Sequence, residues 1–169
     1  MQRDLTISAD VRVSWRFVRE HPAHLIAFGF GAGLAHVAPG TFGTLLAFPV
    51  FWLIQPALSN VQYLLLLLAM FFVGLWACDV TGKALGNADH NGMVWDEIVA
   101  FLLVLFFSPP VLVWQAFAFL FFRLFDIFKP FPIRIFERRF ANGFGVMADD
   151  LIAAFYALLV LAALKAVLN

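Results

Sequence analysis

Two pairs of adjacent carboxylates stand at the start of long apolar stretches of this sequence. Asp96 and Glu97 precede one stretch, and Asp149 and Asp150 precede another. Burying a carboxylate is costly unless a hydrogen bond, a cation or a metal compensates its charge. Each pair alone could cap the N-terminus of a helix. Adjacent residues on a helix point about 100° apart, so a cap accounts for only one member of each pair.

A further carboxylate stands between two basic residues. Arg123, Asp126 and Lys129 recur every three residues, so they share one side of a helix. This series could be a surface ion-pair network. Alternatively, the two cations bind a phosphate while Asp126 binds a metal or orients Arg123. Together with the two acidic pairs, Asp126 gives five carboxylates at one membrane depth. Such a set would repel itself without a cation, and it suits Mg²⁺, which also takes phosphate oxygens as ligands.

A turn rich in Gly and Thr, PGTFGT, occupies residues 39–44. Gly40 and Thr41 could present backbone N–H groups to a phosphate, or the turn could serve only close helix packing. No Gly-Lys-Ser/Thr follows, so the turn is not a Walker A loop. The histidines do not form a metal-ligand pattern, although His90 could contact phosphate and Asp89 could bind a metal.

The composition predicts an integral membrane protein. Of the 169 residues, 63% are hydrophobic and 13% are charged, and the mean hydropathy is +0.91; a soluble domain has about 25% charged residues. The single cysteine, Cys78, excludes an internal disulfide. We expect one domain over residues 1–169, in contact with the lipid bilayer and with no nucleic acid partner. Within it, residues 1–21 are expected to form an amphipathic segment on the membrane surface.

The lengths of the apolar runs set the expected topology. A helix needs about 20 residues to cross about 30 Å of hydrocarbon. Runs at 45–58, 61–78 and 150–168 predict about three spanning helices. The run at 98–122 is interrupted by SPP at 108–110, which leaves halves of about 10–12 residues. We therefore expect a re-entrant helical hairpin in an all-α bundle, with a single straight span as the alternative.

The hairpin would place almost all charge on one face of the membrane. The loops at 31–43, 79–97 and 123–149 would then share that face with ten of the eleven basic residues and all eleven acidic ones. Only Lys165 would lie opposite. A basic excess marks the cytoplasmic side, and a single straight span at 98–122 would lose this bias.

Four stretches together carry a family resemblance: GFGAGLAHVAPGTFGT (29–44), DHNGMVWDE (89–97), FRLFDIFKPFPIR (122–134) and GFGVMADDLIA (143–153). Their content, order and spacing resemble the phosphatidylglycerophosphatase A family. The chain departs from the family pattern, which often has Pro or Gly instead, at His36, Ala100, Asn142 and Ala154.

The resemblance implies a Mg²⁺-dependent, multi-pass enzyme of the bacterial inner membrane with its active site on the cytoplasmic face. It would hydrolyse phosphatidylglycerophosphate to phosphatidylglycerol and inorganic phosphate. The implied catalytic acids are Asp96, Glu97, Asp126, Asp149 and Asp150. The implied metal ligands are Asp89, Asp96, Glu97, Asp149 and Asp150. The implied phosphate-binding residues are Gly40, Thr41, Arg123 and Lys129. The nucleophile could be a water activated by metal and carboxylate, or a carboxylate that forms an aspartyl-phosphate.

Other membrane functions account for the sequence less well. A CDP-alcohol phosphotransferase would carry a spaced Asp–Gly–Ala–Arg–Gly–Asp signature, which is missing here. A transporter or channel would place charged residues within its spans, and the predicted spans carry almost none. A structural subunit would not need five ordered carboxylates and two cations beside turns.

Overall fold

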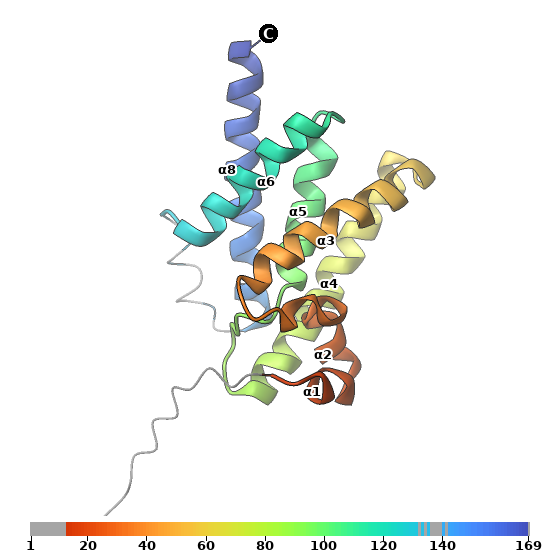
Figure 1. Cartoon of the computed structure of the whole chain (residues 1–169), viewed down its shortest axis with the longest axis vertical. Coiled ribbons are helices and arrows are strands. Elements are labelled where there is room, and N and C mark those ends of the chain that lie inside the picture. The colour runs from red at the N-terminus through yellow and green to blue at the C-terminus, as the bar shows by residue number, and fades with distance from the viewer. Residues whose placement is uncertain (1–12, 132, 134, 136–139, 141, 169) are drawn as a thin grey trace, which may run out of the picture.

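The chain folds as a bundle of helices in which some long members stand upright and others cross the bundle obliquely (Figure 1). The computed structural model describes residues 13–131, 133, 135, 140 and 142–168. Within them the secondary structure is entirely helical, which confirms the expected all-α fold. In chain order the elements are α1 (Trp15–Glu20), α2 (Pro22–Ala27), the 3₁₀ helix η1 (Gly29–Leu34), α3 (Pro39–Ile54), η2 (Gln55–Ala57), α4 (Asn60–Leu85), α5 (Trp95–Phe107), α6 (Leu112–Phe128) and α8 (Gly143–Leu168).

Three of the described helical segments are long and apolar enough to cross a membrane, as expected: Pro39–Ala57, Asn60–Leu85 and Gly143–Leu168. Most residues in their apolar windows are not buried inside the protein. Exposed side chains such as Leu53, Phe72 and Leu159 therefore give the bundle a surface suited to lipid. The first span begins at Pro39, before the apolar run predicted at 45–58, because the PGTFGT turn is itself helical.

The predicted break at 108–110 separates α5 from α6, which turns back along the bundle (Figure 1). The two helices have 13 and 17 residues, or about 20 and 25 Å. The Ser108 hydroxyl donates to the Val104 carbonyl oxygen at 2.7 Å, which satisfies a free carbonyl at the end of α5. Nearly every residue of α5 from Trp95 to Leu105 is buried. The expected helical hairpin is therefore present, with α5 at the centre of the bundle.

Two hydrogen bonds from aromatic side chains tie the helices of the bundle together. The Tyr63 hydroxyl donates to the Leu102 carbonyl oxygen at 3.2 Å, which ties α4 to α5. The Trp52 indole N–H donates to the Gln115 side-chain oxygen at 3.1 Å, which ties α3 to α6. Because a buried polar group without a partner is costly, these bonds fix the helices relative to one another.

Of the short N-terminal helices, α2 packs on the lower part of α4, and α1 packs on α2 (Figure 1). His24 of α2 is buried, hydrogen-bonds the Thr81 hydroxyl at 3.0 Å and stacks on Phe17. In α1, Val18 is buried while Trp15 and Arg16 are exposed, as an amphipathic segment requires. The part of the expected surface segment at 1–12 lies outside the described residues.

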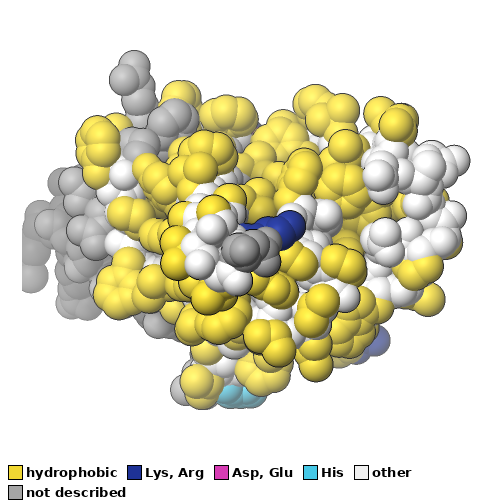
Figure 2. Space-filling model, turned by 90° about the horizontal axis from the view of Figure 1, so that it is seen from above, with side chains coloured by type: hydrophobic (Ala, Val, Ile, Leu, Met, Phe, Trp, Pro, Cys, Tyr) yellow, Lys and Arg dark blue, Asp and Glu magenta, His cyan; other side chains and the backbone are white. Residues whose placement is uncertain are grey.

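The two ends of the bundle differ in charge. The C-terminal end of α8, seen from above, is largely apolar, and none of its visible described side chains is acidic (Figure 2). Lys165 belongs to the last turn of α8 at this end. The acidic residues of α5, α6 and α8 gather at the opposite ends of their helices, where they line one cavity. Several basic residues assigned to that end from sequence lie outside the described residues: Arg3, Arg12, Arg134, Arg138 and Arg139.

Candidate active site

A cavity of about 400 Å³ lies where the starts of α3, α5 and α8 meet the end of α6. The loop between α4 and α5 completes its wall. The cavity brings together nearly all of the residues that the sequence selected. Its lining residues are Ala38, Pro39, Gly40, Asp89, Asn91, Met93, Asp96, Glu97, Arg123, Asp126, Lys129, Asp149 and Asp150.

The start of α3 is shaped to approach α5 closely. Ala38, just before the helix, has a φ of 48° and a ψ of 55°, a left-handed conformation that costs an alanine about 1–2 kcal/mol. Pro39 then begins α3 with its φ already helical. A Cβ on Gly40 would collide with the Glu97 carboxylate. A side chain at position 40 would therefore displace the Glu97 carboxylate from its present position beside Arg123.

Thr44, rather than Thr41, joins the polar network of the site. Thr41 is not among the lining residues. Thr44 lies one helical turn beyond Gly40 and is fully buried. Its hydroxyl donates to the Gly40 carbonyl oxygen at 2.9 Å and accepts from Arg123 Nη1 at 3.4 Å. Spacing on the helix could have singled out Thr44, because residues four apart share a face.

Arg123 joins two carboxylates from different helices. Its Nη1 lies 2.8 Å from Glu97 Oε1 and 2.7 Å from Asp126 Oδ2. All three side chains are only 11–12% exposed, so water screens these charges weakly. The contact fits the orienting role expected for Asp126. It also fixes one oxygen of Glu97 in place.

Lys129 is the second cation of the cavity. It ends α6 with a φ of 41°, directly before Pro130. Its Nζ lies 2.7 Å from Asp149 Oδ2 and 3.7 Å from Asp89 Oδ2. The left-handed backbone of a non-glycine residue marks a position held by its surroundings. Lys129 thus links the end of α6 to α8 and to the loop after α4.

Three carboxylates of the cavity each have a buried oxygen without a hydrogen-bond partner in the described structure: Asp96 Oδ1, Glu97 Oε2 and Asp150 Oδ2. Asp96 and Asp150 are 6% and 3% exposed. Neither makes an ion pair with a described residue. Buried polar atoms of this kind need an explanation, such as a missing ion or water.

The charges of the described residues at this cavity would suit a bound cation. Among the described residues, six carboxylates and two basic side chains line the cavity. Burial raises the pKa of Asp96 well above its usual range, and the charge of Glu97 adds to this. Burial also raises the pKa of Glu97 to about 8, although the Arg123 guanidinium opposes the shift. Without another positive charge, these two groups therefore favour their protonated forms.

The donor set suits a metal that keeps other ligands. Among the described residues, no three His, Cys, Asp or Glu side chains form a group that could hold a metal ion as they stand. Mg²⁺ commonly binds through one or two carboxylates and completes its shell with waters and substrate phosphates. The unpartnered oxygens of Asp96 and Asp150 could supply these two carboxylate ligands.

The interpretation of Asp149 and Asp150 as caps is wrong, because α8 begins at Gly143 and places both in its second turn. Asn142 caps α8 instead, since its side-chain oxygen accepts from the N–H groups of Phe144 and Gly145 at 3.1 Å each. In α5 the capping residue is Val94, which makes no side-chain bond. Asp96 and Glu97 follow it in the first turn.

Comparison with known proteins agrees with this arrangement. A family model described as Phosphatidylglycerophosphatase A matches residues 25–165, which include every lining residue of the cavity. The chain belongs to the phosphatidylglycerophosphatase A family. Asn142, where the sequence departs from the family pattern, keeps a function as the cap of α8.

Named relatives in this family extend the match. A protein of Haemophilus influenzae named Phosphatidylglycerophosphatase A is 45% identical over 86% of this chain and 90% of its own length. A protein of Escherichia coli with the same name is 39% identical over 82% of this chain and 80% of its own length. A Bacteroides thetaiotaomicron protein, provisionally named a phosphatidylinositol-3-phosphatase, is 36% identical over 86% of this chain and 94% of its own length. No solved structure gives a significant match. Membership in this family makes the chain a phosphatase.

Proposed function

We propose that this chain hydrolyses the terminal phosphate of phosphatidylglycerophosphate, with Mg²⁺, to give phosphatidylglycerol and inorganic phosphate. The observation that carries the proposal is the set of unpartnered, buried oxygens on Asp96, Glu97 and Asp150 in one cavity. A phosphomonoester carries two negative charges near neutral pH, so it would be repelled by these carboxylates alone. The names of the Haemophilus influenzae and Escherichia coli relatives support the choice of substrate.

Asp96 and Asp150 are the residues best suited to hold Mg²⁺, because each is buried and lacks a cation partner among the described residues. Glu97 Oε2 is a third candidate ligand. When bound, the metal would neutralise charge on the phosphoryl oxygens and assist the attacking water.

The two basic residues divide into a positioning residue and a phosphate-binding residue. Arg123 is held by Glu97 and Asp126 and sets the position of the Glu97 carboxylate. The Lys129 side chain is 21% exposed at the cavity, so its ammonium is the better partner for a phosphate that enters. In the transition state, a cation beside the transferring phosphoryl group stabilises the negative charge on its oxygens.

Hydrolysis also requires movement of protons. The oxygen of an attacking water forms the new bond to phosphorus, and the bond to the glycerol oxygen breaks. Glu97 Oε2, when it is not a metal ligand, accepts the proton of the water. That proton then passes from the carboxyl group to the departing glycerol oxygen, which restores the hydroxyl of phosphatidylglycerol.

Exposed apolar side chains near the cavity support the proposal of a lipid substrate. Phe42 near the start of α3 and both Ile127 and Phe128 at the end of α6 are more than half exposed beside the cavity. Such side chains are stable at a bilayer surface, where acyl tails remain in lipid while the terminal phosphate reaches the carboxylates. We place this end of the bundle at the cytoplasmic face of a bacterial inner membrane.

The test is phosphate release by the purified full-length chain in mixed micelles. Phosphatidylglycerophosphate should release inorganic phosphate and yield phosphatidylglycerol with Mg²⁺, and not with EDTA. Phosphatidylinositol 3-phosphate is the comparison substrate, because one relative carries that name. Preferential release from phosphatidylinositol 3-phosphate would reject the proposed substrate, and release unaffected by EDTA would reject the metal.

A further inference from the structure

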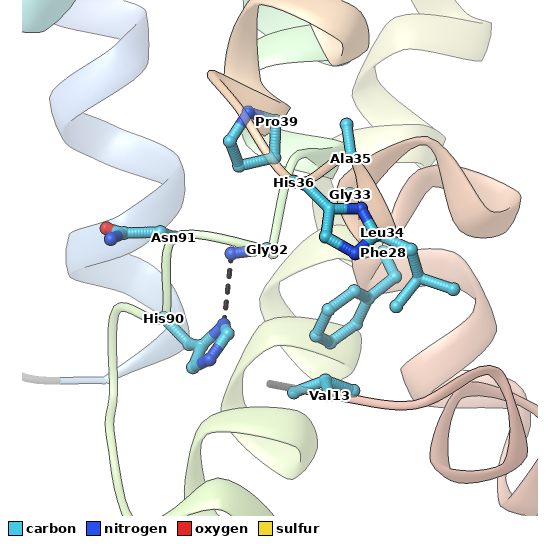
Figure 3. Close-up of a pocket in the computed structure, with 10 residues that line it drawn as sticks. All are labelled: Val13, Phe28, Gly33, Leu34, Ala35, His36, Pro39, His90, Asn91 and Gly92. Atoms are coloured by element: carbon cyan, nitrogen blue, oxygen red, sulfur yellow. Dashed lines mark hydrogen bonds between the residues drawn. The ribbon is translucent and has the colours of Figure 1, made fainter. Parts of the chain in front are cut away.

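Asn91 differs in chemistry from the other described residues that line the carboxylate cavity. It alone among them has a neutral side chain that can form hydrogen bonds, since the others are either charged or apolar. Asn91 also belongs to the wall of a second cavity, of about 320 Å³, which includes His36 and His90 (Figure 3). The two cavities share Asn91 and Pro39, so Asn91 stands at the border between them.

The backbone that carries Asn91 is held in place by its neighbours. The residue lies in a turn that closes when the Met93 N–H donates to the His90 carbonyl oxygen at 2.7 Å. The His90 ring supports the same turn, because its Nδ1 accepts from the Gly92 N–H at 3.0 Å (Figure 3). A Cβ on Gly33 would collide with the Gly92 carbonyl oxygen, so η1 packs directly against the turn. The position of Asn91 is therefore set before a ligand binds, which reduces the entropy lost on binding.

The side-chain amide of Asn91 is available to a ligand. It is exposed and makes no hydrogen bond to a described residue. In Figure 3 the amide points away from His36 and His90 and toward the ribbon of α8. Asp149 and Asp150 of α8 line the same cavity as Asn91. The amide is thus presented to the space in which the terminal phosphate of a substrate would bind.

A neutral amide suits a hydroxyl group better than it suits a phosphate. It donates through its nitrogen and accepts through its oxygen, and a hydroxyl can do both in return. The ionised carboxylates can only accept, while Arg123 and Lys129 can only donate and already contact carboxylates. Among the described lining residues, Asn91 is therefore the one best suited to recognise an uncharged hydroxyl.

The proposed substrate carries such a hydroxyl close to the reacting phosphorus. In phosphatidylglycerophosphate, the middle carbon of the headgroup glycerol bears a free hydroxyl. That carbon is bonded directly to the carbon that carries the terminal phosphate. When the phosphate lies among the carboxylates, the hydroxyl must therefore lie in or at the mouth of the same cavity.

We propose that Asn91 is a specificity-determining residue, whose side-chain amide hydrogen-bonds the hydroxyl on the carbon next to the phosphorylated carbon of the headgroup. The inference rests on the proposed lipid phosphatase function and deepens it. It defines the substrate class as lipid phosphomonoesters with a neighbouring hydroxyl. A lipid phosphate without this hydroxyl would leave the amide unpaired in the complex and would react more slowly.

The test compares phosphatidylglycerophosphate with a deoxy analogue, in which 1,3-propanediol replaces the headgroup glycerol. The analogue keeps both phosphates and lacks only the hydroxyl. The wild-type kcat/KM should be about tenfold lower for the analogue, the effect of one hydrogen bond. Asn91→Ala should have the same kcat/KM for both lipids, because only its value for phosphatidylglycerophosphate falls.

The variant and its control are chosen to leave the fold unchanged. Asn91 is not among the residues with positive φ, so alanine fits its backbone. Asn60→Ala is the matched control, because Asn60 is exposed at the start of α4 and does not line the cavity. It should keep the wild-type preference for the hydroxyl. The inference would be overturned by equal wild-type kcat/KM values for the two lipids, by a preference that survives in Asn91→Ala, or by an equal loss on both lipids.

An NMR titration in maltoside micelles with EDTA separates this inference from the proposed function. The probes are short-chain phosphatidylglycerol and short-chain phosphatidylpropanediol, which lacks the hydroxyl. The side-chain amide signal of Asn91, identified by its absence from Asn91→Ala, should shift saturably and at about tenfold lower concentration with phosphatidylglycerol. Equal responses to the two lipids, or none, would overturn the inference. A selective shift without phosphate release from either substrate would instead reject only the proposed function.

Discussion

At the scale of residues, the site is defined by excess negative charge. Arg123 neutralises part of the negative charge of Glu97 and Asp126, and Lys129 forms ion pairs with Asp149 and Asp89. Asp96 and Asp150 have no basic partner among the described residues. A mixture of paired and unpaired carboxylates is what a site for an exchangeable cation and a phosphate requires. We therefore expect each basic residue to stabilise the protein in the absence of a metal.

Lys129→Gln tests that stabilising role. The change leaves Asp149, whose side chain is 4% exposed, without its 2.7 Å ammonium partner. We expect a loss of about 1–3 kcal/mol in the metal-free protein, the cost of a buried acceptor left unpaired. Mg²⁺ should then raise the melting temperature of the variant more than that of the wild type. Equal melting temperatures without Mg²⁺ would show that the ion pair contributes nothing.

Gly40→Ala tests the close contact between α3 and α5. The added Cβ would collide with the Glu97 carboxylate and move it. The rate of phosphate release should therefore fall by more than about tenfold while the chain stays folded, because a shift of about 1 Å in a catalytic group can lower a rate by about a hundredfold. Gly86→Ala is the matched control. Its Cβ would meet nothing within 4 Å, although its φ of 65° adds backbone strain. Full activity of Gly40→Ala would show that the position of the Glu97 carboxylate does not matter for catalysis.

At the scale of elements, the sequence predicts the apolar core of each helix better than its ends. SPP at 108–110 predicted the turn between α5 and α6, because proline cannot continue a helix. The start of α8 was missed, because hydropathy marks where lipid covers a helix, whereas hydrogen bonding carries α8 back to Gly143. The carboxylates of the site could be selected by type and spacing. The choice between Thr41 and Thr44, and the joining of His36 to His90 in one pocket, depend on packing that spacing does not encode.

Asn142→Ala tests the cap that begins α8. Its side-chain oxygen accepts from two backbone N–H groups, and losing such a cap costs about 1 kcal/mol. Thermal unfolding in detergent should show a lower melting temperature for Asn142→Ala. Asn142→Asp keeps an acceptor and should resemble the wild type. If both variants melted like the wild type, the cap would be irrelevant to stability.

At the scale of the whole molecule, the site and the apolar end lie at opposite ends of the bundle. The starts of α5 and α8 and the end of α6 carry carboxylates of the cavity, and the C-terminal end of α8 is largely apolar (Figure 2). This polarity, with the spans between, matches an enzyme that works on one leaflet. The basic excess predicts that this leaflet faces the cytoplasm.

Cysteine labelling at the two ends of α4 tests the orientation. Ala57→Cys precedes α4 and Ala84→Cys lies in its last turn, and both positions are exposed. Replacing buried Cys78 with alanine leaves one reactive thiol in each variant. A membrane-impermeant maleimide should label Ala57→Cys in intact spheroplasts and Ala84→Cys only after permeabilisation. The reverse pattern would place the active site outside the cytoplasm.

The most direct test of the account is phosphate release from phosphatidylglycerophosphate by Asp96→Asn and Asp150→Asn, compared with Asp79→Asn. Asp79 is a matched control because it pairs with Lys83 on α4 and is not among the residues that line the cavity. With Mg²⁺, both site variants should lose at least about a hundredfold in rate while folded, as expected when electrostatic stabilisation of the transition state is lost. Asp79→Asn should match the wild type. Site variants that keep wild-type rates would contradict the claim that these buried carboxylates perform the chemistry.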